Sequence, residues 1–203
     1  MMPAFKTKLC LLSIISIVAL AANAGALTPP PATRVVVDVK AGQIQQKPPI
    51  PKQNVRVSYE GVFHAQPLTI QPKPNADNRS VDNLIAQMIV ANSKGDPIAM
   101  ASIFMPAERA AVMDTYQDPK LLKPNMQFFR QVTEAALDGY VVDGKVIYLL
   151  TTFKGHEKRP LVVPVVRTEQ GYFLTNKLAN PSTMAELSAA YMHGQIRKLG
   201  LND

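Results

Sequence analysis

The feature that most constrains the fold is a run of β-forming segments between Leu137 and Thr175, separated by short polar turns. An Asp143-Gly144 pair lies between the first two segments, and valine and isoleucine flank it. Asp-Gly between β-rich runs is a strong hairpin signal, because a type I′ turn needs positive φ at both central residues. Polar stretches at 155–158 and 168–171 end the second and third segments. The sequence therefore predicts a three-stranded antiparallel meander.

The second segment of the meander has apolar residues on both faces. Successive strand residues point to opposite sides. One face holds Val146, Tyr148, Leu150 and Thr152, and the other holds Ile147, Leu149, Thr151 and Phe153. Such a strand is predicted to be central, with a layer on each side. The third segment contains Pro160 and Pro164, which cannot donate ladder hydrogen bonds, so it is predicted to lie at an edge or to contain a bulge.

A helix is predicted to begin after Ser80, which is a favoured N-cap residue. The apolar residues that follow recur at helical spacing; they are Val81, Leu84, Ile85, Met88 and Ile89. This spacing gives one continuous apolar face. Lys94-Gly95 ends the helix, Asp96-Pro97 begins a shorter one, and further short helices are expected up to residue 131.

Near the end of the chain, residues 183–198 have the pattern of a tail helix. Thr183 and Glu186 fit a capping box, in which each side chain bonds the backbone N–H of the other residue. Arg197 and Lys198 are placed to complement the helix dipole. We expect the apolar stripe of this helix to pack on the domain; docking on a partner helix or a membrane surface is the alternative.

The first 26 residues are predicted to be a secretory signal peptide. Lys6 and Lys8 precede an uncharged run at 9–22, and cleavage is expected near Ala24 or Ala26. The run is shorter than the roughly 20 apolar residues of a transmembrane helix. We therefore expect a periplasmic or secreted protein with no stable membrane span after cleavage. Cleavage also removes the single cysteine, so the mature protein is not expected to use disulfides or thiol chemistry.

Residues 27–79 are predicted to be an extended, proline-rich arm, because they hold nine of the 17 prolines. Two islands at 34–39 and 54–63 interrupt the prolines. The second island alternates apolar and polar residues with the period of a half-buried strand. We expect one or two strands here, paired either with the main sheet or with the sheet edge of another protein.

The order of elements from 80 to 178 resembles the nuclear transport factor 2-like superfamily of cystatin-related α+β cones. The resemblance lies in an amphipathic helix, the Lys94-Gly95-Asp96 break, a short helix before Pro106, and a meander of long strands. It implies a curved sheet wrapped around the long helix, with a cavity at the wide end. Members use this cavity for isomerisation, dehydration or small-ligand binding, or they bind proteins. The arm and the tail helix depart from the pattern, and either is able to cover the cavity mouth.

We therefore predict an α+β fold with N-terminal amphipathic helices packed on a curved antiparallel sheet, an extended proline-rich N-terminal arm and a C-terminal helix. The predicted divisions are a signal peptide (1–26), the arm (27–79), a cone-like domain (80–178) and a C-terminal helix and tail (179–203).

No motif for nucleophilic catalysis, metal binding or phosphate binding occurs in the sequence. The three histidines are far apart and have no second ligand at metal-binding spacing. No cofactor or metal is therefore expected. The remaining candidates for acid–base chemistry are Asp138, Tyr148 and His156, because each lies on or beside the predicted sheet.

These absences, together with the extended flanking segments, predict a non-enzymatic module that binds another protein in a bacterial cell-envelope assembly, such as a secretion machine. The basic residues are dispersed, so nucleic acid is not an expected partner. Self-association is left open. The alternative is a small-ligand-binding or isomerase-like protein, which requires a cavity of at least about 300 Å³ with a polar group among apolar walls. A cone filled by Phe128, Phe129 or Tyr148 would exclude this alternative.

Overall fold

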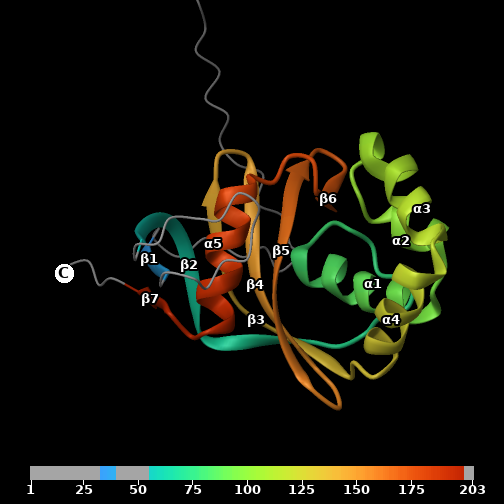
Figure 1. Ribbon diagram of the computed structural model, residues 1–203, viewed down its shortest axis with the longest axis horizontal. Helices are drawn as coiled ribbons and strands as arrows, with labels where there is room; N and C mark the ends of the chain where they lie inside the picture. The colour runs from blue at the N-terminus through green and yellow to red at the C-terminus, as the bar shows by residue number, and fades with distance from the viewer. Residues whose placement is uncertain (1–32, 40–54, 199–203) are drawn as a thin grey trace, which may run out of the picture.

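The computed structural model describes residues 33–39 and 55–198. Seven strands within these residues form one antiparallel sheet, in the order β6-β5-β4-β3-β2-β1-β7 (Figure 1). The strands are β1 (Thr33–Val39), β2 (Val55–Ile70), β3 (Glu134–Asp143), β4 (Val146–Lys154), β5 (Lys158–Thr168), β6 (Gly171–Leu174) and β7 (Ile196–Lys198). The expected signal peptide and parts of the expected arm lie outside the described residues.

Helices cover both faces of the sheet. They are α1 (Val81–Lys94), α2 (Pro97–Ser102), the 3-10 turn η1 (Pro106–Glu108), α3 (Arg109–Gln117), α4 (Pro119–Arg130) and α5 (Pro181–Met192). The group from α1 to α4 connects β2 to β3, and α1 and α4 pack on one face. In contrast, α5 connects β6 to β7 and packs on the other face (Figure 1). None of the helices in the described ranges is both long and apolar enough to cross a membrane.

The predicted order of helices and sheet is wrong, because two strands of the sheet come before the helices. β2 pairs with β1 on one side and with β3 on the other. The helices α1 to α4 are therefore inserted between neighbouring strands. The strand expected at 54–63 continues to Ile70, and its register opposite β3 shifts between Phe63 and Leu68, where Pro67 lies. Of the two pairings left open for the arm, its strands adopt the one with the main sheet.

The meander is present and has one strand more than predicted. β3 and β4 are joined at Asp143-Gly144, and Gly144 has a φ of 61°. The polar turn at 168–171 adds β6 to β5. Because β6 pairs only with the last four residues of β5, Pro160 and Pro164 lie where β5 has no outer strand among the described residues. This agrees with the predicted edge position.

α1 forms the centre of the core on its face of the sheet. Ser80 caps the helix by accepting a hydrogen bond from the backbone N–H of Asn83, and Gly95 ends it in the left-handed conformation. The predicted start and end of this helix are therefore confirmed. Its buried apolar side chains form one cluster with apolar side chains of β3 and β4, including Leu84, Ile85, Ile89, Leu137, Leu149 and Phe153.

α5 is held on the opposite face by polar side chains that the sequence pattern assigned to another role. Asn180, and not Thr183, caps the helix. Thr183 instead donates to Asp143 at 2.6 Å, and Glu186 accepts from Tyr59 at 2.5 Å. The predicted capping box is therefore wrong, and the helix ends before β7. The expectation that its apolar side packs on the domain is confirmed.

A close approach between β2 and β3 makes Gly139 a sensitive position. A Cβ atom there would lie 2.2 Å from the carbonyl oxygen of Val62. We expect Gly139→Ala to lower the free energy of unfolding by about 3 kcal/mol, because the backbone has to move. Gly144→Ala is the matched control: its Cβ would meet no atom within 4 Å, so only the positive φ costs about 1 kcal/mol. If urea denaturation shows the same decrease in the free energy of unfolding for both variants, this explanation is wrong.

Candidate functional site

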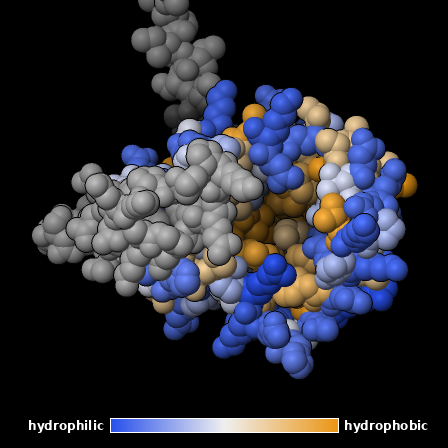
Figure 2. Space-filling view, viewed as in Figure 1, coloured by the Kyte–Doolittle hydropathy of each residue, from blue (hydrophilic) through white to orange (hydrophobic). Residues whose placement is uncertain are grey.

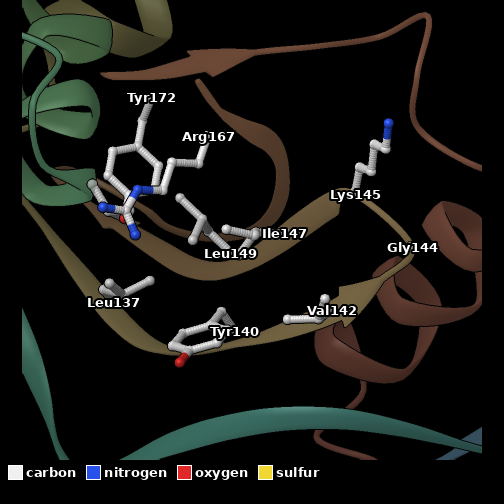
Figure 3. A pocket seen from close by; sticks show the side chains of 10 residues that line it. Leu137, Tyr140, Val142, Gly144, Lys145, Ile147, Leu149, Arg167 and Tyr172 are labelled. Atoms are coloured by element: carbon white, nitrogen blue, oxygen red, sulfur yellow. The ribbon is translucent and has the colours of Figure 1, made fainter. Parts of the chain in front are cut away.

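A pocket of about 370 Å³ opens between the N-terminal end of α1 and the strands β3 to β6. Its walls, most of them shown in Figure 3, are Val81, Leu137, Tyr140, Val142, Gly144, Lys145, Ile147, Leu149, Arg167 and Tyr172. Figure 2 shows hydrophobic residues in a hollow of the surface where α1, β5 and β6 meet, with hydrophilic residues around it. The pocket falls within the size range of small-molecule sites.

A bulge in β3 gives the pocket its apolar floor. Ile147 and Leu149 are two residues apart on β4, so both face α1. Leu137 and Tyr140 are three residues apart and would point to opposite sides of a regular strand. The register shift between Leu137 and Gly139 corrects this difference, and both side chains face the pocket.

Two cations and no carboxylate line the pocket. Arg167 and Lys145 are exposed, and neither forms an ion pair within the part of the chain that the structure describes. By contrast, Lys154 pairs with Glu134 at 2.8 Å. The Arg167 guanidinium lies 5.8 Å from the ring centroid of Tyr172, and Figure 3 shows it beside that ring, whereas Lys145 extends away from both. The lining of the pocket thus combines apolar walls with two cations and no acidic side chain.

Two tyrosines supply the neutral polar groups of the pocket. Arg167 and Tyr172 are cross-strand partners in β5 and β6, so their side chains lie on the same face. Burial, and to a smaller extent the neighbouring Tyr172, raises the pKa of Tyr140. The Tyr140 hydroxyl is therefore protonated at neutral pH and is able to donate a hydrogen bond.

Aromatic side chains fill the opposite end of the same sheet face. Phe128 and Phe129 of α4 lie edge to face with ring centroids 5.0 Å apart, and Phe129 lies 5.4 Å from Phe153 of β4. These contacts close the end of the concave face next to α4. They leave the end next to the β3–β4 hairpin open, so Phe128 and Phe129 fill only part of this face of the sheet.

The structure places none of the three acid–base candidates in the pocket. Asp138 and Tyr148 lie together on the α5 face of the sheet, where Tyr148 is 0% exposed and its hydroxyl accepts from the backbone N–H of Asn180 at 2.8 Å. His156 is exposed in the turn between β4 and β5. The arrangement therefore brings Asp138 and Tyr148 to one face and leaves His156 apart from them.

Asp138 positions α5. Its carboxylate accepts hydrogen bonds from the hydroxyl of Tyr191 in α5 and, at 3.4 Å, from Thr152 in β4. Burial raises the pKa of Tyr191, and the hydrogen bond to Asp138 raises it further, so this phenol remains a donor. The bulge that directs Leu137 to the pocket also directs Asp138 to α5, which explains why the carboxylate is absent from the pocket.

A second hollow of about 410 Å³ lies between α3 and the segment after β6. Its wall includes Glu108, whose carboxylate accepts from the Thr175 hydroxyl and from the backbone N–H groups of Asn176 and Lys177. These contacts assign Glu108 to holding the segment in place. Within the described ranges, no group of three or more His, Cys, Asp and Glu side chains is arranged to hold a metal ion.

The sequence interpretation did not identify Tyr140, Arg167 or Tyr172 as site residues. A signal for two of them was present, because Arg167 and Tyr172 flank the polar turn at 168–171, and residues that flank a hairpin turn become cross-strand neighbours. Tyr140 has no comparable signal, since its direction depends on the bulge beside it.

Comparison of the chain with protein-family models, curated proteins and solved structures found no match.

Proposed function

We propose that this protein binds a small, largely apolar molecule in the pocket between α1 and the sheet. The supporting observation is a pocket of about 370 Å³ with mostly apolar walls and a few polar groups. Its size and lining meet the requirement of the ligand-binding hypothesis. No carboxylate or histidine is among its lining residues, so we propose binding without acid–base catalysis by such groups.

Binding to an envelope protein stays a prediction. The strands of the expected arm pair within the sheet, and α5 buries its apolar side against the same sheet. The described strands of the arm and the apolar side of α5 are therefore engaged in the fold itself, which favours ligand binding over the protein-binding hypothesis.

We also propose that the protein binds its ligand outside the cytoplasm, on the basis of the signal-peptide pattern in the first 26 residues. Relationship to the nuclear transport factor 2-like superfamily stays a proposal as well. Its support is the position of the pocket, which lies between the long helix and the sheet as the resemblance implies.

A neutral fluorescent probe tests the proposed binding. N-phenyl-1-naphthylamine has two aromatic ring systems, no charge, and a fluorescence that rises in apolar surroundings. We expect saturable binding at one probe per folded chain, with a Kd on the order of 100 μM or tighter. Protein unfolded in urea serves as the control and should not bind saturably. Fluorescence that rises linearly with probe concentration and does not saturate with the folded protein would refute the proposed function.

A further inference from the structure

The pocket carries positive charge in addition to its apolar walls. Arg167 and Lys145 are cationic, and no acidic residue lines the pocket. Asp143 is the nearest acid in sequence to Lys145, but it accepts a hydrogen bond from Thr183 in α5 at 2.6 Å, on the other face of the sheet. Positive charge beside an apolar cavity favours a ligand of opposite charge, because apolar walls weaken solvent screening.

We propose, building on the ligand-binding function above, that the ligand is a small organic acid whose apolar body fills the pocket and whose acid group binds the Arg167 guanidinium. A guanidinium presents a planar fork of N–H donors that matches the oxygen atoms of an acid group and binds two of them at once. The Tyr172 ring beside it restricts the motion of the guanidinium, so less conformational entropy is lost when an acid binds.

Arg167 is the better anion partner of the two cations. Its guanidinium lies beside Tyr172 over the apolar residues of the pocket, whereas the Lys145 ammonium points away from them from the hairpin turn (Figure 3). Lys145 is thus placed to attract an anion from a distance, and Arg167 is placed to hold it. The two residues are therefore expected to differ in their effect on affinity.

The lining also limits the kind of acid. Half of the wall residues are aliphatic; they are Val81, Leu137, Val142, Ile147 and Leu149. A sugar phosphate or a nucleotide would leave many hydroxyl or phosphate oxygens against these walls without partners, which is costly. An aromatic or alkyl acid with a single charged end places no such oxygen atoms against the apolar walls. The pocket therefore fits a free amphipathic acid.

Two probes that differ only in an acid group test this inference. The compound 1-anilinonaphthalene-8-sulfonate is N-phenyl-1-naphthylamine with one added sulfonate. We expect the sulfonate probe to bind about tenfold more tightly than the neutral probe, the ratio expected for one charge-assisted contact at an exposed site. Added salt should reduce this ratio, because the cation is partly exposed to solvent.

Arg167→Met is expected to bring the ratio of the two affinities close to one, whereas Lys145→Met should reduce it by no more than about threefold. Arg159→Met is the control for net charge, because Arg159 is on the same strand but stacks on Phe128, away from the pocket. Octanoate should displace the sulfonate probe at a lower concentration than 1-octanol, and at a lower concentration than anionic phospholipid vesicles.

The outcomes separate this inference from the proposed function. If both probes bind with the same affinity, or if Arg167→Met leaves the ratio unchanged, the organic-acid inference is wrong and the binding pocket stands. If vesicles displace the sulfonate probe at a lower concentration than octanoate does, the inferred ligand is a lipid surface and the free-acid inference is wrong. If neither probe binds the folded protein, the proposed function itself is wrong.

Discussion

Glu108→Ala is expected to lower the free energy of unfolding by about 3 kcal/mol or more. Glu108 is 7% exposed, and its two carboxylate oxygens accept hydrogen bonds from Thr175, Asn176 and Lys177 at 2.5, 2.8 and 3.1 Å. Alanine leaves these three donors without the carboxylate acceptor, and one of them, the Thr175 hydroxyl, is buried. The segment that leads from β6 to α5 then loses its anchor, so the effect should be larger than that of a typical single substitution.

Urea denaturation followed by circular dichroism measures this effect. Glu108→Gln keeps one acceptor oxygen and should cost less than the alanine variant. Glu157→Ala, at an exposed position in the turn between β4 and β5, is the matched control and should change stability by less than about 0.5 kcal/mol. A loss in Glu108→Ala as small as that of Glu157→Ala would show that the carboxylate does not hold the segment.

Ile147→Trp is expected to weaken binding of N-phenyl-1-naphthylamine by more than tenfold. Ile147 lines the pocket and is partly exposed to it, so a larger side chain extends into open space before it disturbs the core. An indole at this position occupies volume that the probe needs. A tenfold loss corresponds to about 1.4 kcal/mol of binding free energy, and a full block would exceed it.

The control places the same residue type outside the proposed binding pocket. Ile98 is 69% exposed on α2 and is not among the pocket residues, so Ile98→Trp should retain the wild-type affinity. Unfolding curves of both variants establish that each is folded under the binding conditions. Wild-type affinity in a folded Ile147→Trp variant would place the probe elsewhere on the protein.

Features governed by local chemistry were predictable from the sequence. The Asp143-Gly144 hairpin follows from the positive φ that its turn requires, and Ser80 and Gly95 set the ends of α1 through ordinary capping. In each case the residues that decide the structure are neighbours in the sequence. The central position of β4 was predictable for the same reason, since its alternation alone gives two apolar faces.

Features that depend on distant contacts were not predictable. Pro67 made the second half of β2 resemble an irregular arm, and only the shifted register opposite β3 accommodates it. Thr183 and Glu186 fit a capping box by spacing, yet hydrogen-bond partners in β2 and β3 bind both side chains. The pocket draws its walls from α1 and four strands, so no single segment of the sequence predicts it. The direction of the Asp138 side chain is set by a bulge, so the sequence does not show that this acid–base candidate points away from the pocket.

The most direct test of the central claim is to locate the bound probe by NMR. In protein with labelled isoleucine and leucine methyl groups, N-phenyl-1-naphthylamine should give intermolecular NOEs to Ile147 and Leu149, which line the pocket. It should give none to Leu187, a residue of α5 that is buried against the opposite face of the sheet. NOEs to Leu187, or to exposed Ile98 alone, would contradict a binding site between α1 and the sheet.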